Sequence, residues 1–263
     1  GNWSSLSHWA TTSGGTTLHI QLPTANDDVF FDVNSFSLTG QTVTVNQSSV
    51  FAHHINWTGV LNNPTWGGNS PNVVKIYGSL TLISGMSMDF SGHIQFLSTA
   101  TGQTIATTGK DLPDITFNGS GGEWTLQDAL SCTGISLYSG TLNTNDKMVT
   151  AIGFGTATNS SKTLNMGSSV FNLSGDYPWY VSGLGFTVSC GTSVINCTTS
   201  NTNAQFSAGG TLYDVNFTAT SGSVNIYGNF HDVNFAGNGT INGPANFHDV
   251  TFQKDGTIGP YST

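Results

Sequence analysis

A six-residue phrase occurs three times near the end of the sequence, and it decides the expected fold. It reads LYDVNF over Leu212–Phe217, FHDVNF over Phe230–Phe235 and FHDVTF over Phe247–Phe252. The two steps between the phrases are nearly equal (230 − 212 = 18 and 247 − 230 = 17), and glycine-rich spacers fill them. A short fixed period is typical of a solenoid, because one unit is too small to bury its own apolar face and has to stack on its neighbours.

The apolar residues within each phrase favour strands over helices. Val215 and Phe217 are two positions apart, as are Val233 and Phe235, and a period of two in branched and aromatic residues is the pattern of a strand. The surrounding Gly, Asn and Asp residues form turns. We therefore predict an all-β fold, a right-handed parallel β-helix, because parallel crossovers are almost always right-handed. Successive coils should lie about 4.8 Å apart.

We predict one continuous β-solenoid domain over residues 1–263. Residues 1–25 should form an N-terminal cap, because an uncovered end of a β-helix exposes core side chains and unpaired strand edges. Residues 46–75 interrupt the alternation with Pro, Gly and Asn, and we expect them to protrude as a loop. Residues 212–260 should form regular coils, each as long as one step between the repeated phrases.

The composition argues against nucleic-acid binding and against a helical fold. Charged residues make up 7% of the chain, and the formal net charge is −9. All five basic residues are lysines, so the sequence offers no basic patch to neutralise phosphates. Straight-chain helix formers such as Glu, Lys and Arg are scarce. We expect no membrane insertion, because no apolar run reaches the roughly 18 residues that a spanning helix needs.

The opening of the chain contains LPTANDDV (22–29), TVTV (42–45) and IYGSLTL (76–82). These stretches resemble the start of the extracellular eight-glycine β-helix domain. The chain as a whole is similar to the β-helical segments of large secreted bacterial surface proteins and adhesins, through phrases such as ITFNGSGGEWTLQD (115–128) and GTLNTN (140–145). The resemblance implies export, surface display and adhesion or scaffolding, and it implies no catalytic residue.

We expect a secreted, non-enzymatic structural protein at the cell surface or outside the cell. The last repeat offers strand edges and core side chains to a partner, so copies of the chain would assemble head-to-tail into a filament. The further coils of a longer protein, such as an adhesin, would cover the same end. A carbohydrate-binding module is an alternative. A β-helical polysaccharide-degrading enzyme is a weaker one, because Glu123 is the only glutamate and glycosidases need paired carboxyl groups.

Two groups of residues are candidates for ligand binding. Aspartates near the start of the chain could hold a calcium ion, the one cofactor we consider, through hard oxygen ligands, or they could cap turns: Asp27, Asp28 and Asp32. Aromatic residues in the irregular segments could stack on sugar rings, or they could pack those segments onto the coils: Trp57, Trp66, Tyr177, Trp179 and Tyr180.

The repeated phrase also aligns polar residues from coil to coil. His231 and His248 are one coil apart, and so are Asp214, Asp232 and Asp249. Aligned carboxylates repel each other, so they must cap turns, share protons or bind a cation. A zinc site needs three or four converging ligands, and the sequence therefore favours a ladder of turns over a metal site.

The chain also contains candidate modification sites. Cys190 and Cys197 could close a small disulfide loop outside the cell, with Cys132 left as a buried apolar residue, or all three could stay reduced in the core. Nine Asn-x-Ser/Thr sequons occur, and we expect glycans on some of them if the protein is exported: Asn2, Asn46, Asn56, Asn118, Asn159, Asn172, Asn196, Asn216 and Asn238.

Overall fold

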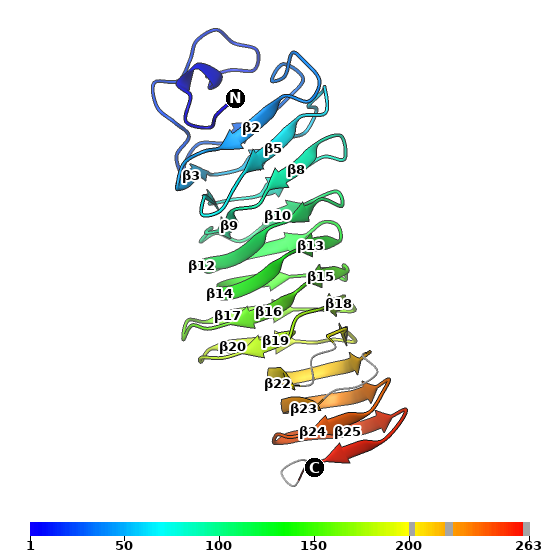
Figure 1. Ribbon diagram of the computed structural model, residues 1–263. Helices are drawn as coiled ribbons and strands as arrows, with labels where there is room; N and C mark the ends of the chain where they lie inside the picture. The colour runs from blue at the N-terminus through cyan, green and yellow to red at the C-terminus, as the bar shows by residue number, and fades with distance from the viewer. Residues whose placement is uncertain (200–202, 219–222, 260–263) are drawn as a thin grey trace. The chain divides into compact units, whose positions relative to one another are not determined.

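The computed structural model describes residues 1–199, 203–218 and 223–259 of the chain (Figure 1). They form an all-β protein in which parallel strands stack coil on coil into a β-solenoid. The chain divides into two compact units, Gly1–Ser131 and Cys132–Thr263, which are described in turn. Among the described residues, helical structure is limited to the 3-10 turn η1 (Leu6–His8), and none of it has the length and apolarity to cross a membrane.

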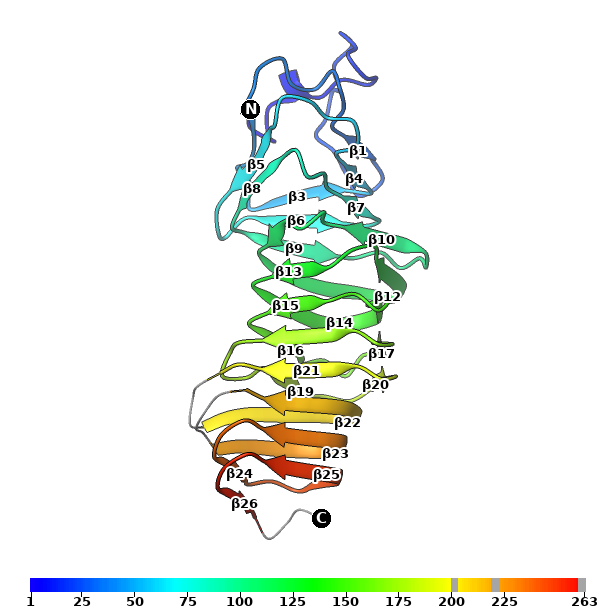
Figure 2. The same ribbon diagram turned by 90° about the vertical axis from the view of Figure 1, so that its right-hand side faces the viewer.

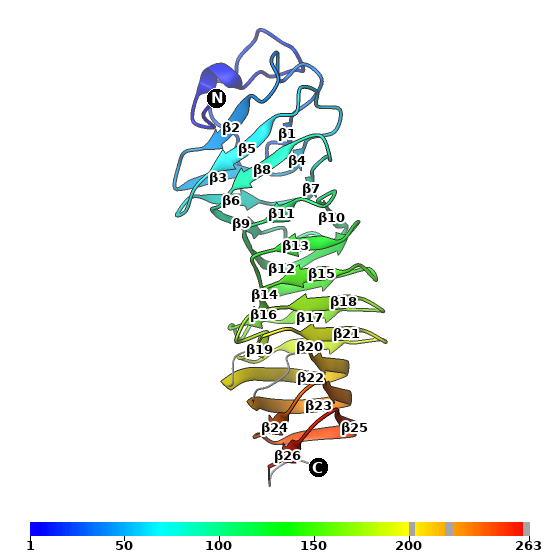
Figure 3. The ribbon, with the colours of Figure 1, turned by 45° about the vertical axis from the view of Figure 1, so that its right-hand side comes forward.

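The strands of the first unit form three parallel columns. One contains β2 (Thr42–Val45), β5 (Thr65–Gly68) and β8 (Ser87–Phe90), which lie side by side in Figure 3. The second contains β3 (Ser49–Ala52), β6 (Val73–Ile76), β9 (His93–Phe96) and β12 (Asp114–Leu126), of which Figure 2 shows the first three stacked in order. The third contains β1 (Val29–Phe30), β4 (Ile55–Asn56), β7 (Leu80–Thr81) and β10 (Gln103–Ala106). The short strand β11 (Asp111–Leu112) precedes β12, and β13 (Leu130–Cys132) contains the boundary between the units.

Alternation along each strand sends every second side chain into the core. Val50, Val74 and Ile94 occupy the same register position in β3, β6 and β9, and all three are buried. Branched side chains thus stack on one another from coil to coil. A strand of four residues is stable only within such a stack, because it cannot bury its own apolar face.

The expectation that residues 46–75 protrude as a loop is wrong. This range contains β3, β4 and β5 and most of β6. Gly67 and Gly68 belong to β5. Gly68 has a φ of 132°, and a Cβ at that position would lie 2.5 Å from the carbonyl oxygen of Val45 in β2. Glycine is therefore required for the close stacking of β5 on β2 and does not mark a loop.

The second unit continues the same construction with thirteen further strands among its described residues. They are β14 (Gly134–Asn143), β15 (Val149–Ala151), β16 (Gly153–Thr156), β17 (Lys162–Asn165), β18 (Val170–Leu173), β19 (Trp179–Val181), β20 (Phe186–Ser189), β21 (Val194–Cys197), β22 (Asn203–Phe217), β23 (Ser223–Phe235), β24 (Gly239–Ile241), β25 (Ala245–Phe252) and β26 (Gly256–Ile258).

The three repeated phrases stack in the register that their period predicts. Phe217 lies opposite Phe235, and Phe235 lies opposite Phe252. The ring centroids are 4.9 Å apart at both steps, which matches the spacing of neighbouring strands, about 4.8 Å. Residues 219–222 and 260, which the predicted repeat region includes, lie outside the described residues.

Candidate functional site

The described part of the chain holds two clusters of side chains that could ligate a metal. Asp28, His53 and His54 form one in the first unit, and His231, Asp232 and His248 form the other in the second unit. In each cluster, one ligand atom from every residue lies within 4.8 Å of the others.

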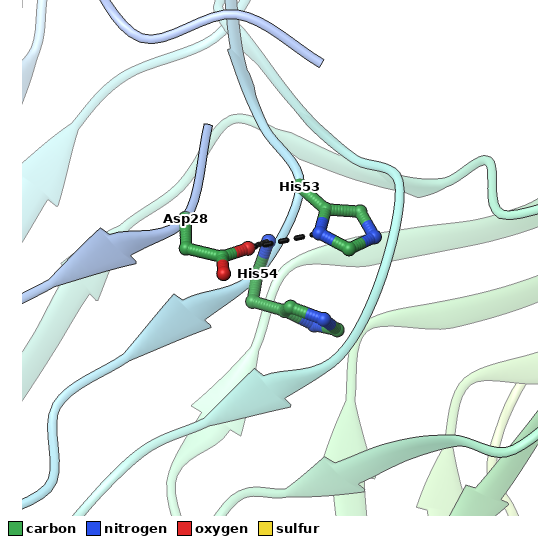
Figure 4. Close-up of side chains that lie close together, drawn as sticks. All are labelled: Asp28, His53 and His54. Carbon is green, nitrogen blue, oxygen red and sulfur yellow. Dashed lines mark hydrogen bonds and ion pairs between the residues drawn. The ribbon is translucent and has the colours of Figure 1, made fainter. Parts of the chain in front are cut away.

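The first cluster is assembled by the pairing of β1 with β4. Val29 lies opposite Ile55 in that pair, which places Asp28, just before β1, beside the two histidines just before β4 (Figure 4). The Nδ1 atom of His53 is 2.8 Å from Oδ1 of Asp28. The backbone N–H of His54 donates to the same carboxylate oxygen at 3.3 Å.

The hydrogen bonds of His54 leave neither of its ring nitrogens open to a metal. The backbone N–H of Ser79 donates to Nδ1 of His54 at 2.7 Å, so the proton of the neutral ring is on Nε2. Burial lowers the pKa of His54, and the adjacent His53 lowers it further, against an opposing effect of Asp28. A metal at Nε2 would push the proton to Nδ1 and break the bond to Ser79. We interpret the first cluster as a hydrogen-bonded turn.

In the second cluster, aromatic rings stack across three coils. Tyr213 lies 4.3 Å from His231 at an interplanar angle of 10°, and His231 lies 5.0 Å from His248 at 4°. The repeat places these rings on top of one another because Phe230 pairs with Phe247 in the neighbouring strand.

Carboxylates run beside the stacked rings. Asp214 pairs with Asp232, and Asp232 pairs with Asp249. The Nδ1 atom of His231 is 3.2 Å from Asp214 and 3.3 Å from Asp232, while Nδ1 of His248 is 3.6 Å from Asp232 and 3.3 Å from Asp249. We call these five residues the His–Asp column. The Nδ1 atom of each imidazole lies beside two carboxylates, and the aligned carboxylates repel each other.

The sequence identifies the His–Asp column but misses the first cluster. It groups Asp28 with its sequence neighbours, whereas the partner of Asp28 is His53, at a separation of 25 along the chain. That separation is one coil, since Val29 pairs with Ile55. A search for residues one coil length apart would have identified this pair. The sequence over 46–75 is irregular, however, so the length of this coil cannot be recognised from it.

The three aspartates considered as a calcium site do not converge on one point. Asp27 accepts hydrogen bonds from the backbone N–H and the hydroxyl of Thr24, and these bonds lower the pKa of Asp27. Asp32 accepts from the backbone N–H of Asn34 at 2.9 Å, and Asp28 contacts His53. The three carboxylates therefore serve three different partners, and turn capping is the correct interpretation for Asp27 and Asp32.

The sugar-stacking prediction is wrong for the three tryptophans. Trp57, Trp66 and Trp179 are all 0% exposed, because they point into the core, where Trp57 stacks on Phe31 at 4.0 Å. Tyr177 and Tyr180 do lie at the surface, with 58% and 42% of their area exposed.

Cys190 and Cys197 are not bonded to each other, so the candidate disulfide between them is not formed. The carbonyl of Cys190 accepts from the backbone N–H of Ser193, which places Cys190 beside the start of β21. Cys197 is at the far end of that strand and points into the core. Four extended residues separate the ends by about 10 Å, beyond the reach of a disulfide.

Three of the nine sequons belong to an asparagine ladder, which consists of Asn172, Asn196, Asn216 and Asn234. The side-chain amide of each later member donates to the amide oxygen of the one before, at 2.9, 3.0 and 3.1 Å. The sequon asparagines outside the ladder are exposed, apart from the half-buried Asn56: Asn2, Asn46, Asn118, Asn159 and Asn238.

A cavity of about 680 Å³ lies between the N-terminal segment and the residues around β1. Its lining includes Trp3, Trp9, Asp27 and Asp32. Trp9 donates through Nε1 to the carbonyl of Trp3 at 2.8 Å, and both carboxylates already accept hydrogen bonds from neighbouring turns. We interpret the cavity as a gap in the packing of the N-terminal segment.

Comparisons with protein-family models, with curated proteins and with solved structures find no significant match. The function is therefore argued from geometry and composition.

Proposed function

We propose that this chain is a non-enzymatic structural β-solenoid of the cell exterior, which stacks head-to-tail on copies of itself to form a filament or contributes to a surface adhesin. The observation that carries the proposal is the continuity of side-chain ladders from coil to coil in the second unit. Such ladders are open-ended, because each coil offers the next the same register of groups.

The ladders involve both the core and the surface. The stacked rings of Phe217, Phe235 and Phe252 repeat one apolar contact at every step. The asparagine ladder repeats one amide hydrogen bond along the outer face. A surface built from amides and hydroxyls, with 7% charged residues in the whole chain, avoids the repulsion that stacked like charges would cause. This construction suits a scaffold outside the cell.

The coil that contains β25 and β26 has a face on which a second copy could stack. Phe230 and Phe235, one coil earlier, are 5% and 2% exposed, and the equivalent Phe247 and Phe252 are only half-buried. Ile258 in β26 is 49% exposed. A further coil would bury these side chains, and a head-to-tail contact of this kind grows into a fibre unless it closes on itself.

The test is negative-stain electron microscopy of the chain together with sedimentation velocity over a range of concentrations. We expect fibres and fast-sedimenting material for the wild type. Ile258→Lys places a charge on the stacking face, so this variant should sediment as a single small species. Because Ile258 is half-exposed, the substitution leaves the core of the unit intact.

Met148→Lys is the matched control. Met148 is 51% exposed in the turn before β15, so it presents a similar apolar area away from β26, and its variant should assemble like the wild type. A wild-type chain that stays monomeric at every concentration would overturn self-assembly. If Ile258→Lys formed as many fibres as the wild type, the face around β26 would not be the contact between copies.

A further inference from the structure

We propose that His231, Asp232 and His248 bind one divalent transition-metal ion of the zinc class. The three residues come from neighbouring coils of the repeat, and one ligand atom from each already lies within 4.8 Å of the others. The argument concerns the second unit alone and is independent of the function proposed above.

The carboxylate oxygen at the centre of the cluster has contacts but no hydrogen bond. Oδ1 of Asp232 lies 3.3 Å from Nδ1 of His231 and 3.6 Å from Nδ1 of His248. This oxygen is shielded from solvent, and no described residue donates a hydrogen bond to it. A shielded oxygen without a donor is costly, and a cation held between it and the imidazoles would remove that cost.

The donor set selects the class of metal. Two imidazole nitrogens and one carboxylate form a set that zinc and related ions accept, with a fourth position left for water. Calcium and magnesium prefer ligand sets made of oxygens. Asp249, whose Oδ2 is 3.3 Å from Nδ1 of His248, is the nearest protein group for the fourth position.

The cluster needs a modest rearrangement to close around an ion. Zinc–nitrogen bonds of about 2.1 Å place tetrahedral ligand atoms about 3.4 Å apart. Oδ1 of Asp232 is already at about that distance from both Nδ1 atoms, and because all ligand atoms of the cluster lie within 4.8 Å of one another, none has to approach another by more than about 1.4 Å. The parallel rings must turn toward each other. His248 can do so, because 68% of its side chain is exposed. His231 is held on its other side by Tyr213 at 4.3 Å, and an ion bound through Nδ1 of His231 would replace its 3.2 Å hydrogen bond to Asp214 and release the proton of that bond. Tyr213 occupies the position of these histidines in the first of the three repeated phrases. The described repeats therefore contain one pair of stacked histidines, His231 and His248.

The charges of the column favour a cation. Asp214, Asp232 and Asp249 align along one edge of the coils, and each close pair of carboxylates repels. A divalent ion at the shared oxygen of Asp232 would offset this repulsion. The Asp28–His53–His54 cluster has a single carboxylate, and Nδ1 of its His54 accepts a hydrogen bond from Ser79. It therefore serves as the internal comparison.

The experiment is a titration of the metal-free chain with zinc chloride by calorimetry, repeated with cobalt(II) and visible absorption as a report on tetrahedral coordination. We expect one ion per chain and a cobalt spectrum of the tetrahedral type. His248→Gln should lower the zinc affinity at least about tenfold, since even changes to groups that only support a metal ligand have effects of that size. His53→Gln is the matched control and should bind zinc like the wild type.

The fold of the His248→Gln variant can be checked separately from its zinc affinity. Because His248 is mostly exposed, this variant should retain the far-UV circular dichroism and the urea midpoint of the metal-free wild type, so its loss of affinity would not reflect unfolding. No zinc binding by the wild type would overturn the proposal. So would equal affinity in His248→Gln, or loss of binding in His53→Gln alone.

Discussion

Lys162, the first residue of β17, is 1% exposed, and its ammonium donates to three backbone carbonyls. The acceptors are Thr158 at 2.5 Å, Ser160 at 3.0 Å and Leu184 at 2.8 Å. These bonds use all three donors of the ammonium, and they tie the turn before β17 to the segment before β20. Burial lowers the pKa of Lys162, so these charge-assisted bonds have to offset the cost of desolvation.

Replacing this lysine should therefore be strongly destabilising. Lys162→Met keeps the apolar stem but leaves three carbonyls without their donor, and we expect the free energy of unfolding to fall by about 3 kcal/mol. Urea unfolding measures this loss. The exposed Lys254 provides the control, since Lys254→Met should change stability by less than about 0.5 kcal/mol. Equal stabilities of the two variants would contradict a structural role for the ammonium.

The role of Lys162 could not be predicted from the sequence. Its three partners are backbone carbonyls, two from the preceding turn and one from the next coil, and carbonyls have no sequence signature. The role of Asp27, in contrast, is among the roles that the sequence suggests. Asp27 follows Thr24 within a Pro- and Asn-rich turn, and turn capping is one of the two alternatives that the sequence offers.

At the scale of strands, the asparagine ladder connects β18, β21, β22 and β23. Asn196 is in the middle, donating to Asn172 at 2.9 Å and accepting from Asn216 at 3.0 Å. The amides all point the same way along the stack, so each bond polarises the next. The hydrogen bonds of the ladder thus favour the same strand register as the stacked apolar side chains inside the coil.

Asn196→Ala should break the ladder at both of its bonds. We expect a loss of about 2 kcal/mol in the free energy of unfolding, from two hydrogen bonds of about 1 kcal/mol each. Asn238→Ala removes a sequon at an exposed position and should leave stability within about 0.5 kcal/mol of the wild type. Circular dichroism during urea unfolding gives both values, and a loss in Asn196→Ala no larger than in the control would rule out a stabilising ladder.

The strands were predictable where the sequence repeats and unpredictable where it does not. The period of the repeated phrase predicts the pairing of Val215 with Val233 and of Val233 with Val250. Gly67 and Gly68 have no such period, and the same residue type serves a loop or a close strand contact. Whether these glycines form a loop or a close strand contact depends on the distance of the neighbouring strand β2, and that distance is set by the tertiary structure.

At the scale of the whole molecule, the sequence predicts the solenoid but misplaces the three candidate tryptophans. Trp57 and Trp66 occur in a segment whose sequence suggests a loop, and both are core residues of coils. Three of the four asparagines of the ladder are recognisable only as sequons, because their hydrogen bonds join residues one coil apart. In a solenoid, the residues that contact a side chain are one coil away in the sequence. The role of a residue can therefore be predicted only when the length of its coil is known.

Two partly buried histidines predict how the stability of the first unit responds to acid. Burial lowers the pKa values of His54 and His93 in the folded chain, whereas the pKa of an unfolded histidine is about 6.5. As the pH falls below that value, the unfolded state takes up protons that the folded state does not. Stability is therefore complete above a pH of about 6.5 and is lost as the pH falls toward the lowered pKa, by at most about 1.4 kcal/mol per pH unit for each histidine.

Hydrogen exchange between pH 7 and pH 5, corrected for the intrinsic exchange rate, should show weaker protection around β3 and β4 at the lower pH. His54→Asn is the decisive variant, because its amide oxygen can accept from the Ser79 N–H in place of Nδ1 and does not titrate. Its pH dependence should be flatter than that of the wild type, whereas the exposed His8→Asn should leave it unchanged. A wild-type slope in His54→Asn would mean that the lowered pKa of His54 does not govern acid sensitivity in this unit. A flatter slope would link the stability of the first coils to the single hydrogen bond that also excludes a metal from the first cluster.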